Sequence, residues 1–183
     1  MAKMKSSIKS ITGEAHYVKL FEDDRDMMAY NTVSGAYDLP SPHNGTYICG
    51  IVISEEDHRR LRVEGNFNVG YSKMQHDGRE LISFKRKHEA RDRKGDIMDW
   101  NSGAPKVMDM SGKPWSKDKQ GIIWNGSKLE VTYEEFGEKN WSRLVSVKVL
   151  ELADEPEREP DTSLMEATGE AATAKDDSDK VPF

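Results

Sequence analysis

The sequence of 183 residues has a single cysteine, 8% aromatic residues and no long apolar run. Because the lone Cys49 cannot form an internal disulfide, we expect a reducing, cytoplasmic setting. No stretch approaches the roughly 20 apolar residues that a membrane-spanning helix needs. The first residues include lysines without an apolar run behind them, so we expect no signal peptide there. The composition therefore disfavours secreted and membrane proteins.

Motifs that hold phosphates or metals are also missing. The pattern Gly-x-x-x-x-Gly-Lys does not occur, and the five histidines are scattered along the chain. Asp96, Asp99 and Asp109 are close in sequence, but their spacing matches no ligand motif. We therefore expect no enzymatic activity, cofactor or metal. A nuclease or resolvase that uses these three carboxylates is kept as an alternative, to be tested with DNA and Mg²⁺.

Charge is divided unevenly along the chain. The formal net charge is −6, and only 36% of residues are hydrophobic. Residues 153–183 contain ten acidic and three basic residues, a charge of −7, so residues 1–152 carry the remaining +1. A polar, acidic segment of this kind is typical of disorder. We predict a folded domain over residues 1–152 and a flexible acidic tail over residues 153–183.

Alternation of apolar and polar residues predicts several short strands. Leu129, Val131 and Tyr133 share one face of a strand over residues 128–133. Residues 144–152 predict a second, nearly central strand, with Val145, Val147 and Val149 on one face and apolar residues on the other face too. Ser54, followed by an acidic residue three positions later, predicts the start of a short helix. Further strands are predicted at residues 15–21, 46–53, 80–88 and 106–110.

Short strands, one short helix and no alternation of strands with long helices favour an all-β barrel or sandwich. A five-stranded OB-fold barrel fits this pattern. OB folds bind oligonucleotides on the face of strands two and three and on the loops between strands one and two and strands four and five. Those loops correspond to residues 22–44 and 135–142, and both contain aromatic residues. We expect residues 65–78 to be irregular.

Residues 79–94, the basic segment, hold seven Lys or Arg against three acids, a local charge of +4. Lysine and arginine along a track neutralise phosphates, and aromatic rings stack on bases for about 1–3 kcal/mol per base. A solvated basic strand, with aromatic side chains that plug the barrel ends, is the structural alternative. The candidate DNA-binding residues are Arg79, Phe84, Lys85, Arg86, Lys87, Arg91, Arg93, Lys94, Tyr30, Tyr37, Trp100 and Trp141.

The acidic tail ends on an aromatic residue. Acidic disordered segments often serve only solubility. An inert tail gives no reason for a terminal Phe183, whose ring and α-carboxylate together suit a basic-rimmed pocket on a partner. The candidate partner-binding residues are Asp176, Asp177, Asp179, Pro182 and Phe183.

Residues 126–133, 145–152 and 176–183 resemble the single-stranded DNA-binding proteins of short-tailed (podovirus) phages, and residues 107–113 are similar to that family's preceding strand and turn. The final residues also resemble the acidic, Pro-Phe-ended tips of bacterial single-stranded DNA-binding proteins. Two departures are a shorter helix after the second strand and Lys180, which interrupts the acidic run.

The resemblance implies an OB fold that binds single-stranded DNA independently of sequence, in phage DNA replication, recombination and repair. It also implies a homodimer in which one subunit's tail can cover the other's DNA groove. Through that tail the protein would recruit replication enzymes, DNA polymerase and helicase-primase, in the host cell cytoplasm. An RNA-binding OB or cold-shock-like module remains the alternative, because stacking alone does not separate RNA from DNA.

Overall fold

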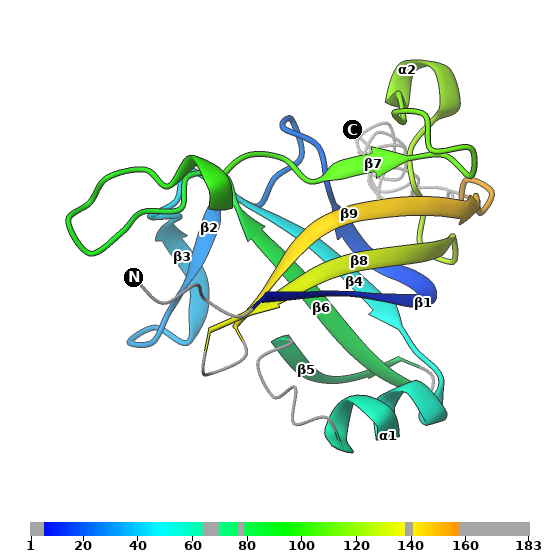
Figure 1. The fold of residues 1–183 in the computed structure, drawn as a ribbon, viewed down its shortest axis with the longest axis horizontal. Helices are drawn as coiled ribbons and strands as arrows, with labels where there is room; N and C mark the ends of the chain where they lie inside the picture. Colours follow the sequence, from blue (N-terminus) through cyan, green and yellow to red (C-terminus); the bar gives the residue numbers. More distant parts are fainter. Residues whose placement is uncertain (1–5, 64–69, 77–78, 138–140, 158–183) are drawn as a thin grey trace, which may run out of the picture.

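The computed structural model describes residues 6–63, 70–76, 79–137 and 141–157, and its body is one curled sheet (Figure 1). The strand order is β5-β6-β4-β1-β8-β9-β7. Neighbouring strands are antiparallel except β7 and β9, which are parallel. The strands are β1 (Ser6–Lys19), β4 (Thr46–Val52), β5 (Gly70–His76), β6 (Arg79–Lys87), β7 (Lys106–Met108), β8 (Lys128–Phe136) and β9 (Trp141–Glu151).

A hairpin and three short helices complete the described chain. Strands β2 (Met28–Asn31) and β3 (Ala36–Pro40) form a separate two-stranded sheet beside the large one (Figure 1). The helices are α1 (Glu55–Val63), the 3₁₀ turn η1 (Asp99–Asn101) and α2 (Lys117–Gln120). The predicted all-β class with a short helix is confirmed and the fold is OB-like. The predicted five-strand count is not confirmed, because the main sheet has seven strands.

The core lies on the inner face of the curled sheet, and the alternation in β8 is confirmed there. Leu129, Val131 and Tyr133 are at most 2% exposed, because every second side chain of the strand points inward. The prediction for β9 was wrong at one residue. The register shifts between Thr132 and Tyr133, so Leu144 faces the core in place of Val145. A β-bulge of this kind reverses the alternation beyond it.

Strand β1 connects the two halves of the sheet. It pairs with β8 from Ser6 to Glu14 and with β4 from Glu14 to Lys19, with a register shift near Ala15. The chain crosses so close to β4 at this shift that a Cβ on Gly50 would lie 2.3 Å from the carbonyl oxygen of His16. The absence of a side chain at Gly50 therefore permits the bend of β1.

Two segments predicted as irregular contain strands. Residues 70–76 form β5, and the long connection over residues 22–44 contains the β2–β3 hairpin. The hairpin turn is stabilised by Asn31, whose Oδ1 accepts from Val33 N at 2.9 Å and whose carbonyl accepts from Gly35 N at 2.8 Å. The helix predicted after Ser54 is confirmed as α1, and the Ser54 hydroxyl accepts from Asp57 N at 3.1 Å.

Candidate nucleic-acid interface

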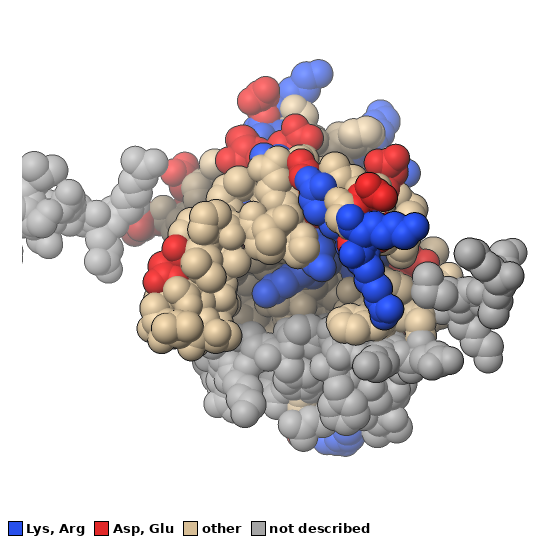
Figure 2. All heavy atoms as spheres, turned by 90° about the vertical axis from the view of Figure 1, so that its left-hand side faces the viewer, with Lys and Arg blue, Asp and Glu red and all other residues tan. Residues whose placement is uncertain are grey.

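A groove of about 460 Å³ lies between the β2–β3 hairpin, the ends of β4 and β6, and the β8–β9 end of the sheet. Figure 2, which faces the left-hand side of Figure 1, shows this face hollowed, with Lys and Arg side chains gathered beside the hollow. The groove brings together six of the predicted site residues from four elements. They are Tyr30, Tyr37, Lys85, Arg86, Lys87 and Trp141.

Aromatic rings reach the groove from two parts of its lining. On the hairpin, Tyr30 and Tyr37 are cross-strand partners with ring centroids 5.3 Å apart, and both are more than half exposed. At the other side, Trp141 is 56% exposed and is the cross-strand partner of Phe136. Trp100 and Phe136 form a T-shaped ring contact, with centroids 5.9 Å apart and planes at 83°. Exposed rings on both sides can stack on bases that are not themselves paired.

The end of β6 supplies the cations, and its alternation separates them into two kinds. Lys85 and Lys87 share the exposed face of the strand and line the groove. Phe84 and Arg86 point the other way. Phe84 is only 1% exposed, with its ring centroid 4.7 Å from that of Tyr133. The prediction that Phe84 stacks on DNA was therefore wrong, because its ring is part of the core.

Arg86 is half-buried and binds protein rather than facing solvent. Its Nε donates to the Gly103 carbonyl at 2.8 Å, its Nη2 to that of Ser102 at 2.9 Å and its Nη1 to that of Leu144 at 3.2 Å. Burial, and next the positive charge of Arg143, lower the pKa of the Arg86 guanidinium. The predicted phosphate contact is therefore replaced by a structural role, because all three nitrogens already donate to carbonyls.

The rest of the basic segment lies away from the groove lining. Arg79 begins β6, at the opposite end of the strand from Lys87, and its side chain is outside the described part of the structure. Arg91 donates to the Glu89 carboxylate at 2.7 Å and to the Gly95 carbonyl at 2.9 Å. The structure places Arg93 and Lys94 on the exposed turn that follows, outside the groove lining.

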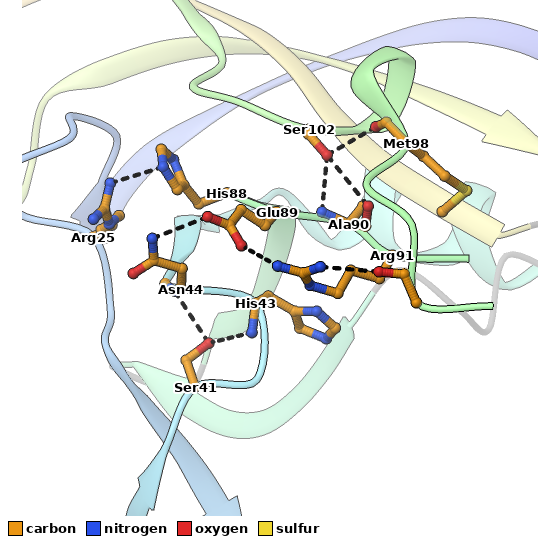
Figure 3. A network of polar contacts seen from close by, with 12 residues as sticks. Arg25, Ser41, His43, Asn44, His88, Glu89, Ala90, Arg91, Met98 and Ser102 are labelled. Atoms are coloured by element: carbon orange, nitrogen blue, oxygen red, sulfur yellow. Dashed lines mark hydrogen bonds and ion pairs between the residues drawn. The ribbon is translucent and has the colours of Figure 1, made fainter. Parts of the chain in front are cut away.

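Polar contacts join the loop after β6 to the loop before β4 (Figure 3). Arg25 Nη1 donates to His88 Nε2 at 3.1 Å, so this nitrogen accepts and the ring proton is on Nδ1, 2.7 Å from the Tyr47 hydroxyl. Asn44 Nδ2 donates to Glu89 Oε1 at 3.1 Å, and Glu89 in turn binds Arg91. These contacts fix the groove edge on which His43 lies.

Sequence reasoning missed several lining residues, His43 and Arg143 among them. The buried Nδ1 of His43 has no hydrogen-bond partner among the described residues. Burial, and next the charge of Lys87, lower the pKa of His43. Arg143 lies two positions after Trp141, so alternation, which places both residues on one face of β9, was a usable signal for its position.

The structure places Asp109, one of the carboxylates of the nuclease alternative, in a turn. Asp109 Oδ1 accepts from the backbone nitrogens of Ser111 at 2.9 Å and Lys113 at 3.0 Å, as expected for a turn. Among the described residues, no three His, Cys, Asp or Glu side chains are placed to hold a metal ion.

None of the helices described is long and apolar enough to cross a membrane. The predicted tail residues lie outside the described part: Asp176, Asp177, Asp179, Pro182 and Phe183.

Comparisons with known proteins give a likeness of fold. No protein-family model matches the sequence, and a search of curated proteins finds no match. Among solved structures, the chain is similar to the crystal structure of gp2.5, a single-stranded DNA-binding protein encoded by bacteriophage T7. The TM-score is 0.52 at 20% sequence identity, and the match covers 88% of this chain and 100% of that one. The chain therefore shares the fold of that phage protein.

Proposed function

We propose that this protein binds single-stranded DNA, without sequence preference, in the groove between the β2–β3 hairpin and the β8–β9 end of the sheet. The observation that carries the proposal is the composition of the groove. Exposed aromatic rings reach it from two sides, and Lys85 and Lys87 lie on the sheet that forms part of its lining. The likeness of fold to a phage protein described as a single-stranded DNA-binding protein supports the same assignment.

The chemistry of the groove suits a single strand better than a duplex. Rings such as Tyr37 and Trp141 gain stacking energy only from bases whose faces are accessible, and a duplex buries those faces between neighbouring base pairs. Every base has a π-face, and lysine ammonium groups contact phosphates that carry no sequence information. Binding through these groups is therefore tolerant of sequence.

We further propose that the protein is not an enzyme and acts in phage DNA replication, recombination and repair as a homodimer. Its acidic tail would recruit DNA polymerase and helicase-primase through Phe183 and the acidic residues before it. The support for these finer assignments is the charge of −7 over residues 153–183 and the resemblance of residues 126–133, 145–152 and 176–183 to the single-stranded DNA-binding proteins of short-tailed phages. A polyanion tethered to the domain also competes with DNA phosphates for the same cations.

A binding titration with an oligo-dT length series tests the proposal. We expect tight binding at low salt that weakens steadily as the salt concentration rises, with a poly-dT competitor far more effective than duplex DNA. Preference for poly-U over poly-dT would indicate the RNA-binding alternative. Degradation of DNA in the presence of Mg²⁺ would indicate a nuclease. Failure to bind any single strand would refute the proposed function.

A further inference from the structure

Arg143 lines the groove, where the simplest role for a cation is to bind phosphate, but its donors are already engaged. Its Nε donates to Glu134 Oε2 at 2.7 Å, and its Nη2 forms an ion pair with the same carboxylate. Its Nη1 donates to the Trp100 carbonyl and, at 3.4 Å, to Asn101 Oδ1. The side chain is only 17% exposed. Its three nitrogens and its charge are thus all paired within the protein.

The same guanidinium lies against an aromatic ring beside the groove. Its Cζ is 4.9 Å from the ring centroid of Trp100, a cation–π contact, although half of the Trp100 surface remains exposed. Trp100 makes a T-shaped contact with Phe136, and Phe136 is the cross-strand partner of Trp141. Arg143 therefore contacts Trp100, which packs on Phe136, the cross-strand neighbour of the exposed Trp141.

Arg86 anchors the same segment from another strand. It donates to the carbonyls of Ser102 and Gly103, whereas Arg143 donates to that of Trp100. Two arginines, one from β6 and one from β9, thus hold four consecutive residues, 100–103, against the sheet. Fixing a stacking surface before binding removes part of the ordering cost that an incoming strand would otherwise meet.

We propose that Arg143 is a positioning residue of the groove. This proposal rests on the proposed binding of single-stranded DNA. Its guanidinium holds Trp100 and Phe136 in the orientation that stacks on bases, and it does not bind phosphate. Lysine cannot replace it, because an ammonium group lacks the planar fork that binds Glu134 and the Trp100 carbonyl while lying flat on the indole.

Salt dependence separates positioning from phosphate binding. Loss of a phosphate ligand should shallow the slope of log K against log salt by about 0.7 for a single strand. We expect Arg143→Gln to leave the slope unchanged and to weaken oligo-dT binding on the order of tenfold. Arg143→Lys should weaken oligo-dT binding to the same extent. Lys85→Gln, on β6 in the same groove lining, is the matched control, and it should shallow the slope.

Two further measurements keep the inference testable if Arg143→Gln folds poorly. Without DNA, Arg143→Lys should increase iodide quenching of tryptophan fluorescence, and the increase should vanish in a Trp100→Leu background. With DNA, Trp100→Leu and Arg143→Lys should be strongly non-additive in binding free energy, because both remove the same stacking surface.

Full affinity of Arg143→Lys, or a shallower slope for Arg143→Gln, would overturn the inference and make Arg143 a phosphate ligand. Normal binding by Trp100→Leu would overturn it as well. Both outcomes leave the proposed function intact, since the wild type still binds oligo-dT. If the wild type itself fails to bind, the proposed function fails first.

Discussion

The exposed lysines of β6 and the arginines that hold residues 100–103 line the same groove, but the two kinds of cation are used in opposite ways. Lys85 and Lys87 are exposed, and neither forms an ion pair within the described part of the chain. Arg86 and Arg143 instead donate to backbone carbonyls or a carboxylate within the protein. The difference follows from chemistry, since a flexible ammonium group suits mobile phosphates whereas a planar fork suits fixed carbonyls. Charge density along the sequence therefore does not identify the phosphate track.

The largest expected effect is on stability, at Arg86. Arg86→Ala removes donors from three carbonyls, so we expect a loss of roughly 2–4 kcal/mol in the free energy of unfolding. Lys85→Ala, one residue away on the exposed face, should change it by no more than about 0.5 kcal/mol. Thermal or urea unfolding of both variants checks this. Equal stability of the two would show that Arg86 contributes no more to the fold than an exposed lysine.

Aromatic stacking should give the next largest effect. Trp141→Ala should weaken oligo-dT binding by about 1–3 kcal/mol, because an exposed stacking ring is lost. Its thermal midpoint should stay close to that of the wild type, since Trp141 is 56% exposed. Fluorescence quenching by DNA should fall in the same variant. A collapse of the midpoint would instead indicate that Trp141 supports the fold and that its stacking role is wrong.

The two lysines should control salt dependence. Changing Lys85 and Lys87 together to Ala should shallow the slope of log K against log salt by about 1.4, twice the single-strand value of 0.7 per phosphate. Arg93 and Lys94, changed together to Ala, provide a control of equal charge on the exposed loop. If the loop pair shifted the slope and the strand pair did not, the DNA path would follow the loop.

The acidic tail offers a further test of the lysines. Deletion of residues 154–183, which carry the whole tail charge of −7, should tighten DNA binding at low salt, on the order of severalfold, because a tethered polyanion no longer competes. The gain should fade at high salt and be smaller in the Lys85, Lys87 double variant. In contrast, Phe183→Ala should leave DNA affinity nearly unchanged and weaken pull-down of replication enzymes. A deletion variant that binds DNA no tighter than the full chain would rule out competition.

His43 should give the smallest effect, through pH. Its pKa is lowered, first by burial and then by Lys87, so the folded state takes up its proton less readily than the unfolded chain. Stability from His43 is therefore present above its ordinary pKa of about 6.5 and is lost as the pH falls below it. His43→Asn should reduce the fall in thermal midpoint between pH 7.5 and pH 5. An identical fall in the variant would contradict this assignment.

The core strands were predictable because their outer and inner faces differ. Leu129, Val131 and Tyr133 alternate with polar residues, and this pattern alone specifies β8. The β2–β3 hairpin was missed for the opposite reason. Every side chain of β3 is exposed, so no apolar alternation marks it. At Leu144 and Val145, alternation predicted the wrong core-facing residue. The β-bulge there depends on pairing with β8, and the sequence pattern of β9 alone holds no information on that pairing.

The candidate site was predictable as a set of residue types, but only in part as a set of contacts. Phe84 could have been excluded from the candidate DNA-binding residues by applying strand alternation to the basic segment, because Phe84 and Lys85 must face opposite sides of the strand. The role of Arg143 depends on a carboxylate nine residues away and on a carbonyl 43 residues away. No local pattern contains that information, because the contact exists only after β8, β9 and residues 99–103 have come together.

The double pairing of β1 has a consequence for how the chain folds. Ser6 lies opposite Phe136. The part of β1 that pairs with β8 therefore has no partner strand until residues up to 130 positions later have been synthesised. At a translation rate of roughly 5–20 residues per second, that interval is on the order of 6–26 s. Sheets that depend on such distant pairings also fold slowly, because the loop must close before the contacts form. The nascent protein therefore exposes an unpaired strand edge on the ribosome until β8 has emerged.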